Sequence, residues 1–312
     1  MKKILSILLI FSIILVGCSN GGDLKKEGPD EVKEVYTSMY PVYAMVKYIG
    51  GDKVNVSNIM PNNRDAHHWE PKAKDIINLS EADILFINGL GMESWLEKTK
   101  ESLGDLKIVD LSKDLDLIKI DEEHDNNHEE DDHDHEEHHH HNSEYDPHIW
   151  LSLDNLEDEL ERICDELSKI SPENKKYFED NLSKYENEIE KIEDEYEDKF
   201  DKYEGRAIIV PHEAFGYLVK DLELIQISIE GINSDSEPGS GRLKEIIDYA
   251  KKNSIKTVFY EKGGSKEAAE TIAREINGEV KEISTLEVNL EEDKDFLEIY
   301  KDNLDSILDS FE

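Results

Sequence analysis

A single apolar stripe near the middle of the chain constrains the fold more than any other feature. Eight apolar or aromatic side chains recur there at spacings of 4, 3, 4, 3, 4, 4 and 3 residues: Phe178, Leu182, Tyr185, Ile189, Ile192, Tyr196, Phe200 and Tyr203. This is the spacing of one face of an α-helix. Because an α-helix rises 1.5 Å per residue, the 26 residues from Phe178 to Tyr203 predict a rod of roughly 39 Å. A coiled-coil dimer is the alternative, but fewer than four heptads between strand-rich halves favour a spine that joins two lobes.

Short β-rich runs alternate with amphipathic stretches on both sides of this helix. Before it we expect strands at 35–40, 54–60, 83–89 and 107–110, and helices at 42–49, 71–79 and 92–103. After it we expect strands at 206–211, 223–229, 256–261 and 279–284, and helices at 215–221, 241–253 and 266–277. Such alternation indicates βα units and mostly parallel sheets. We therefore predict an α/β fold in which two lobes with mostly parallel sheets are joined by one long rigid helix.

The first 18 residues have the pattern of an export signal. Two lysines precede an apolar run of 13 residues from Ile4 to Val16, and Gly17 then precedes Cys18. A run of this length is shorter than the roughly 20 residues that a membrane-spanning helix needs. Residues 15–18 (LVGC) resemble the bacterial lipobox, which predicts that residues 1–18 are a lipoprotein signal peptide with lipidation at Cys18. A plain secretory signal with an incidental cysteine is the alternative. Residues 19–30 are then a polar tether.

The other thiol, Cys164, borders the apolar stripe of a predicted helix over 153–170, so we expect it to be buried and inert.

Histidine and acidic residues are concentrated in one segment. Asp121–Glu144 holds 12 acidic residues and no lysine, arginine or apolar residue, so we predict a disordered surface loop. It also contains eight of the 12 histidines, which could form weak, exchangeable metal sites: His124, His128, His133, His135, His138, His139, His140 and His141. The whole chain has a formal net charge of −39, which argues against binding to nucleic acid or to anionic lipid.

The four remaining histidines lie near predicted strand-to-helix junctions or beside the acidic loop. They are His67, His68, His148 and His212. Ligands of open α/β sheets bind beyond the carboxyl ends of the strands, so at least His67 and His212 are expected to face a common cleft. Any one of them alone could be a core or capping histidine. Neutral imidazole is a common zinc ligand, and nearby carboxylates could orient the rings: Asp65, Glu70, Asp146 and Glu213.

Together these motifs resemble the substrate-binding lipoproteins of metal ABC transporters, in the zinc/manganese receptor family. The resemblance rests on residues 65–71 (DAHHWEP), 146–151 (DPHIWL), 211–217 (PHEAFGY) and 258–261 (VFYE). It implies that a metal lies between the lobes, bound by the three histidines His67, His148 and His212, with His68 only a neighbour.

The fourth ligand that the resemblance implies is a carboxylate that follows the last strand. Many relatives have aspartate where this chain has Ser284, so the simplest correspondence fails. Some zinc-binding members end this motif in Leu-Glu, and Glu287 matches that glutamate. Glu261 and water are the alternatives.

The resemblance also implies a domain organisation and a role. The N-terminal lobe is expected at 31–170, with the acidic loop at 121–144 inside it, the linking helix at 171–205 and the C-terminal lobe at 206–312. The role is that of an extracytoplasmic zinc receptor, monomeric and lipid-anchored, which performs no catalysis and delivers Zn²⁺ to a membrane permease. Three imidazoles and a carboxylate favour tetrahedral zinc over manganese. A manganese or iron receptor, an adhesin and an extracellular zinc hydrolase are the alternative functions.

Overall fold

The computed structural model describes residues 32–61, 64, 66–120, 144–232, 238–291 and 293–312. The predicted signal peptide, Cys18, the tether and the eight loop histidines lie outside these residues. Within the described ranges, no helix combines the length and the apolar character needed to cross a membrane.

The N-terminal half contains a four-stranded parallel sheet with the order β2-β1-β3-β4. Its strands are β1 (Lys33–Thr37), β2 (Val54–Asn58), β3 (Ile84–Ile87) and β4 (Lys107–Asp110). The helices α1 (Tyr40–Gly50), α2 (Ala73–Ser80) and α3 (Leu96–Leu103) alternate with them. All four residues of β3 are buried, as expected for a central parallel strand that is covered on both faces.

The C-terminal half repeats this topology in a second parallel sheet with the order β6-β5-β7-β8. Its strands are β5 (Ala207–Val210), β6 (Ile225–Ser228), β7 (Thr257–Glu261) and β8 (Glu279–Ile283). The helices α6 (Gly216–Asp221), α7 (Ser240–Asn253) and α8 (Glu267–Ile276) alternate with them. The predicted α/β class with two parallel sheets is confirmed, and each strand prediction overlaps an observed strand.

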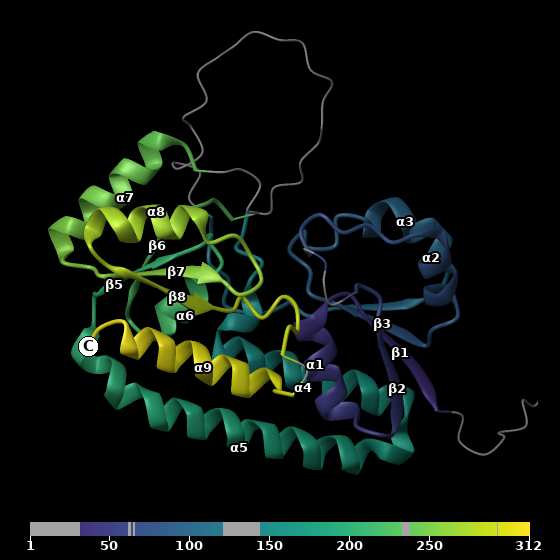
Figure 1. The fold of residues 1–312 in the computed structure, drawn as a ribbon. Coiled ribbons are helices and arrows are strands. Elements are labelled where there is room, and N and C mark those ends of the chain that lie inside the picture. The colour runs from purple at the N-terminus through teal and green to yellow at the C-terminus, as the bar shows by residue number, and fades with distance from the viewer. Residues whose placement is uncertain (1–31, 62–63, 65, 121–143, 233–237, 292) are drawn as a thin grey trace, which may run out of the picture. The chain divides into compact units, whose positions relative to one another are not determined.

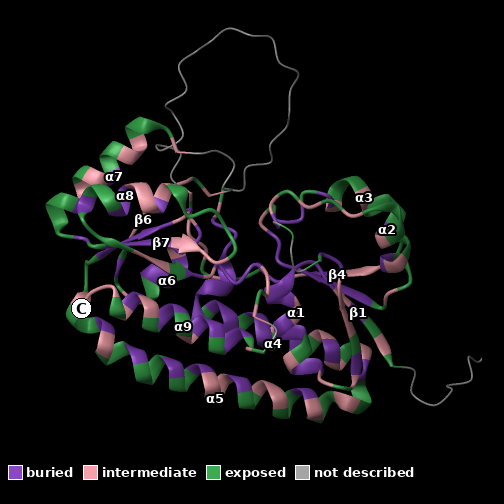
Figure 2. Cartoon of the chain, in the orientation of Figure 1, coloured by how far each residue is buried: buried purple, intermediate pink, exposed green. Residues whose placement is uncertain are grey.

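Two helices link the two halves along the chain, α4 (Leu153–Ile170) and α5 (Lys175–Phe200), and α9 (Phe296–Asp309) packs against α5 after the last strand. Helix α5 runs below both sheets, with α9 above one part of it (Figure 1). The predicted apolar stripe of α5 faces the core, where Phe178, Ile189 and Phe200 are among its buried side chains. The core is continuous from one half to the other along these helices (Figure 2). The long helix therefore acts as the predicted spine.

Two details of the helices differ from the sequence expectation. Helix α5 ends at Phe200 because residues Asp201–Tyr203 tighten into a 3₁₀ turn, so Tyr203 is not part of it. Helix α9 was not predicted, although it begins with a capping box in which Asp295 and Glu298 bond each other's backbone N–H groups. The thiol of Cys164 is buried, as expected, and burial raises its pKa.

Helix α4 also buries a carboxyl group away from the strand ends. The Glu159 residue is 0% exposed, and neither of its carboxylate oxygens has a hydrogen-bond partner among the described residues. Burial raises its pKa to about 8, only partly opposed by the charge of Arg162. The folded protein therefore keeps a proton on the Glu159 carboxyl group up to about pH 8. In the unfolded protein the same carboxyl group loses its proton above a pH of roughly 4.3. The free energy of unfolding should fall as pH rises from there towards 8.

We expect Glu159→Met to stabilise the protein more at pH 8 than at pH 5, by up to about 4 kcal/mol, because it removes the cost of keeping this carboxyl neutral. Urea unfolding at both pH values measures the difference. Glu161→Met, at an exposed position of the same helix, is the control and should change stability by no more than about 0.5 kcal/mol. An equal gain from Glu159→Met at both pH values would contradict the assignment.

Candidate metal centre

Four side chains that follow different elements meet at one point. His67 lies between β2 and α2, His148 directly precedes the 3₁₀ turn Ile149–Leu151, His212 lies between β5 and α6, and Glu287 lies between β8 and α9. Three of the four therefore follow the carboxyl end of a parallel strand, where ligand sites of α/β folds are found. One ligand atom of each residue lies within 4.8 Å of those of the others.

The glutamate lies at the centre of this arrangement. Its Oε1 atom is 3.8 Å from Nε2 of His67, 3.5 Å from Nε2 of His148 and 3.6 Å from Nε2 of His212. Ligand atoms around a tetrahedral zinc ion, at bond lengths of 2.0–2.1 Å, lie about 3.3 Å apart. The three separations between Oε1 and the Nε2 atoms are slightly longer than this value.

Three of the four facing atoms are buried and lack a hydrogen-bond partner among the described residues. The residues His148, His212 and Glu287 are 0%, 2% and 6% exposed. Neither Nε2 of the two histidines nor Oε1 of the glutamate has a hydrogen-bond partner among the described residues. Buried polar atoms are nearly always hydrogen-bonded, so a group of them aimed at one point requires an explanation. A divalent cation at their centre would bond to all of them at once.

Carboxylates behind two of the rings fix which nitrogen faces the centre. Asp146 Oδ1 lies 2.7 Å from Nδ1 of His148 and also accepts the His148 backbone N–H at 2.9 Å. Glu261 Oε2 lies 3.3 Å from Nδ1 of His212, and Thr285 donates to the other oxygen of Glu261 at 2.7 Å. With Nδ1 engaged, Nε2 of each ring is directed to the centre. This is the usual arrangement of metal-binding histidines.

The structure thus distinguishes between Glu287 and Glu261, the two glutamates that the sequence offered as the fourth ligand. Glu287 lies on the Nε2 side of His212 and close to all three histidines, whereas Glu261 lies behind His212 on the Nδ1 side. The sequence named Glu261 only as a reserve ligand and did not foresee its place behind the ring. Its position at the end of β7, beside the strand that precedes His212, was the available signal.

The other described residues that were named from the sequence do not belong to the metal-compatible group of three histidines and one glutamate. Glu70 pairs with Lys98 at 2.7 Å on the surface, so the expectation that it orients a site histidine is wrong. The Nδ1 atom of His212 faces Glu261 rather than its sequence neighbour Glu213. Within the described residues, His68 is not part of the metal-compatible group, in line with its predicted role as a neighbour. Asp65 lies outside the described residues.

The histidines and carboxylates at the centre shift one another's pKa values strongly. Burial alone would lower the pKa of His212, but Glu261 and Glu287 raise it to about 10. Burial likewise opposes the charged form of His148, yet Asp146 and Glu287 raise its pKa. Burial would raise the pKa of Glu287, but the neighbouring histidines hold it well below the usual value. The metal-free centre therefore keeps protons that a cation must displace.

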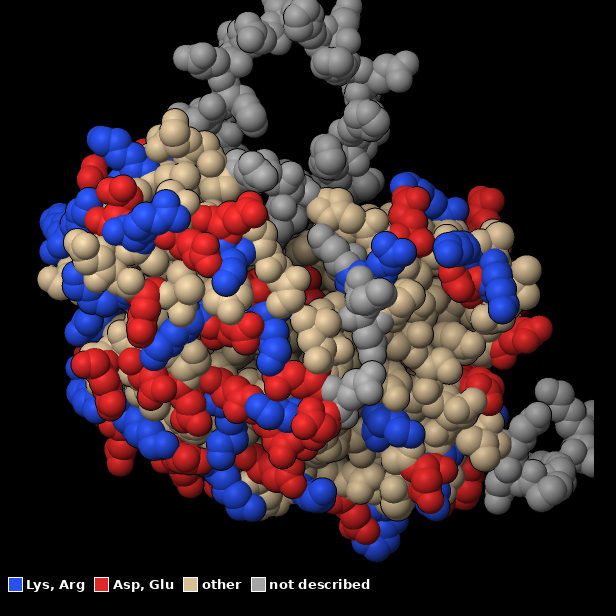
Figure 3. Space-filling view, viewed as in Figure 1, with Lys and Arg blue, Asp and Glu red and all other residues tan. Residues whose placement is uncertain are grey.

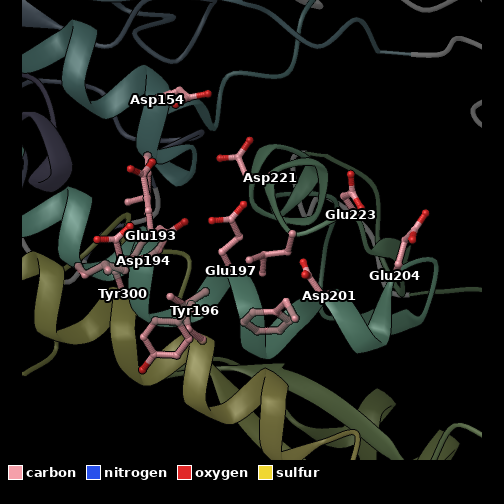
Figure 4. A pocket seen from close by; sticks show the side chains of 15 residues that line it. Asp154, Glu193, Asp194, Tyr196, Glu197, Asp201, Glu204, Asp221, Glu223 and Tyr300 are labelled. Carbon is pink, nitrogen blue, oxygen red and sulfur yellow. The ribbon is translucent and has the colours of Figure 1, made fainter.

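A second hollow is acidic but separate from this centre. It has a volume of about 460 Å³ and is lined by parts of α4, α5, α6 and α9, with Glu193 and Asp221 among its carboxylates (Figure 4). Burial and the neighbouring carboxylates raise the pKa of Glu193 to about 7 and that of Asp221 to about 6. None of the four residues of the histidine cluster lines it.

Comparison with known proteins identifies a consistent set of relatives. The family model described as zinc-uptake complex component A, periplasmic, matches residues 35–310. The chain is 33% identical over 319 residues to the high-affinity zinc uptake system protein ZnuA of Bacillus subtilis (strain 168), covering 99% of this chain and 98% of that protein. It is 31% identical to the zinc-binding lipoprotein AdcA of Streptococcus pneumoniae, covering 98% of this chain but 60% of AdcA.

Solved structures give the same result. A crystal structure of ZnuA matches with a TM-score of 0.76 and 29% identity over 90% of this chain and 100% of that chain. The laminin-binding protein Lmb of Streptococcus agalactiae, described as having adhesin and metal-transporting activity, matches with a TM-score of 0.78 and 28% identity, at the same coverage of both chains.

We expect Glu287→Ala to weaken zinc binding by more than about 100-fold, because it removes the atom shared by three histidines. Glu261→Ala should cost about 10- to 100-fold, the usual effect of losing a carboxylate that orients a metal-binding histidine. Competition with a chelator at one pH measures both dissociation constants. The assignment would be wrong if the Glu261 variant were the more damaged of the two.

Zinc affinity should fall steeply with acid, since His212 with a pKa of about 10 carries a proton in the metal-free protein at neutral pH. Displacing the His212 proton alone makes the dissociation constant rise about tenfold for each unit by which pH falls, so at least about 100-fold between pH 8 and pH 6, because the raised pKa of His148 adds to the effect. Calorimetry in buffers of different ionisation enthalpy counts the protons released. A dissociation constant that stayed the same over this range would contradict the coupling.

Proposed function

The chain belongs to the family of periplasmic zinc-uptake complex component A proteins, and from this membership we propose that it is an extracytoplasmic zinc receptor. It captures Zn²⁺ between its two lobes and passes the ion to an ABC permease in the membrane. The observation that carries the proposal is the convergence of His67, His148, His212 and Glu287 on one point. We propose these four residues as the zinc ligands.

The chemistry of the ligand set supports zinc as the cargo. Three imidazole nitrogens and one carboxylate oxygen are a typical zinc set and complete its preferred tetrahedral coordination. Manganese favours more oxygen ligands, usually around an octahedral ion. The relatives named above are described as zinc uptake and zinc-binding proteins, which agrees with this choice.

The same set supports a receptor rather than an enzyme. Catalytic zinc sites usually have three protein ligands and keep a fourth position for water or substrate. Here a fourth protein side chain, Glu287, occupies that place in the cluster. The protein would then bind and release the ion without changing any covalent bond.

The N-terminal segment is the basis of the proposed location outside the cytoplasmic membrane. Cleavage before Cys18 and acylation of this residue would leave a lipid-anchored monomer, tethered through residues 19–30, outside the cytoplasmic membrane. The relative AdcA is described as a lipoprotein, which supports this reading. The lobes are proposed at 31–170 and 206–312, with the linking helix at 171–205.

Acidic side chains gather over α5 and α9, interspersed with lysines (Figure 3). Such a surface attracts cations and repels polyanions.

The histidine-rich segment 121–144 is proposed as a secondary zinc-gathering element. Its eight histidines alternate with carboxylates, so each would bind zinc weakly and exchange it quickly. In this proposal the segment raises the local zinc concentration, and the centre between the lobes supplies the tight site.

The test compares three forms of the full chain: wild type, the triple variant His67→Ala/His148→Ala/His212→Ala, and a variant without residues 121–143. Wild type should titrate with one tight zinc site and several weaker ones. The triple variant should lose the tight site alone, and the shortened chain should lose the weak ones alone. Zinc uptake by cells that depend on this receptor should fail with the triple variant. Uptake that persists without the three histidines would refute the receptor proposal.

A further inference from the structure

Two short chain segments form an antiparallel stem at the base of the histidine-rich segment. Residues 118–120 and 144–146, here called the stem, pair through a bridge between Lys119 and Tyr145. The backbone N–H of Ile120 donates to the Glu144 carbonyl at 3.0 Å, and that of Asp146 donates to the Ile118 carbonyl at 2.9 Å. The second strand of the stem leads directly to His148.

One buried tyrosine of α6 bonds both strands of the stem. The Tyr217 hydroxyl accepts the backbone N–H of Ile118 at 3.1 Å and donates to the carbonyl of Asp146 at 2.9 Å. The residue is 1% exposed, and burial raises the pKa of its hydroxyl, so the hydroxyl keeps the proton that it donates. A single side chain from the C-terminal half thus fixes the chain on both sides of the histidine-rich segment.

Asp146 connects this stem to the metal centre. Its N–H and carbonyl belong to the stem contacts, and its Oδ1 accepts from both the backbone and the ring of His148. Its Oδ2 lies so close to α6 that a Cβ added at Gly216 would meet it at 2.7 Å. Only glycine fits at that position without displacing the carboxylate. Directly after Asp146, the Pro147 carbonyl accepts a hydrogen bond from the Asn88 side chain at 2.9 Å.

From these contacts we infer that Tyr217 is a positioning residue for metal binding: by bonding both strands of the stem it holds Asp146, and through Asp146 the ring of His148, in the geometry that zinc requires. The inference rests on the proposed function and extends it to a residue that touches none of the four ligands in the contacts described above.

Tyr300 provides a matched control. It is also 1% exposed, and its hydroxyl donates to the Leu151 carbonyl at 3.1 Å, just beyond His148. Tyr217→Phe and Tyr300→Phe each keep the ring and remove one buried hydroxyl from a tyrosine that bonds the backbone of residues 146–151. Only the first change affects the stem and Asp146. A merely structural role for Tyr217 predicts similar consequences for both.

The experiment measures three properties of the full-length variants: the free energy of unfolding without metal, the zinc dissociation constant, and the rate of zinc release to a chelator. Tyr217→Phe should weaken zinc binding about 10- to 100-fold, the range for residues that orient metal-binding histidines, mainly through faster release. Tyr300→Phe should stay within about threefold of wild type. Hydrogen exchange at the amides of Ile118 and Asp146 should quicken in the Tyr217 variant alone.

Gly216→Ala is the second variant, because its added methyl group displaces the Asp146 carboxylate while the Tyr217 hydroxyl remains. It should weaken zinc binding to a similar degree, and it decides the question if Tyr217→Phe fails to fold. Zinc affinities of Tyr217→Phe and Tyr300→Phe that match, or a Gly216→Ala variant that binds like wild type, would overturn the inference. Failure of wild type itself to bind zinc would instead refute the proposed function.

Discussion

The metal centre depends on three buried atoms, Nε2 of His148, Nε2 of His212 and Oε1 of Glu287, which face one another and lack hydrogen bonds among the described residues. Placing such atoms away from water without hydrogen bonds is costly, and it becomes favourable when a cation bonds to all of them. No single element could hold the metal-compatible group, since its members lie in four different connections and up to 220 positions apart along the chain, from His67 to Glu287. The scaffold has to bring them together and keep their rings oriented.

The fold does so through two sheets of the same strand order and through one long helix that joins them. Both sheets have the same strand order, so the carboxyl ends of β2, β5 and β8 each lead into a connection that carries one member of the cluster. Helix α5 and its buried stripe join the halves through one continuous core. Behind the rings, Asp146 and Glu261 set the direction of Nε2. Support of this kind turns three scattered histidines into one site.

Much of this was predictable from the sequence, for physical reasons. Helical and strand periodicities identified the two sheets and the spine, and the positions of His67 and His212 after strands predicted that they face a common cleft. The full ligand set, with His148 and Glu287, came from the resemblance to metal receptors. Glu287 was preferred to Glu261 only through the resemblance, because both lie at the carboxyl ends of neighbouring strands and side-chain direction alone distinguishes them. The stem was missed because its pairing joins residues on either side of a long polar segment, where no periodic pattern reports it. Glu159 was missed because a carboxylate on an acidic helix is ordinarily exposed.

A crystal structure of the full chain with one equivalent of zinc, with anomalous diffraction recorded at the zinc edge, tests the central claim most directly. The account predicts one anomalous peak at about 2.0–2.2 Å from Nε2 of His67, His148 and His212 and from the Glu287 carboxylate, with no further ligand. A peak at any other place, or an ion at this place completed by water instead of Glu287, would contradict it.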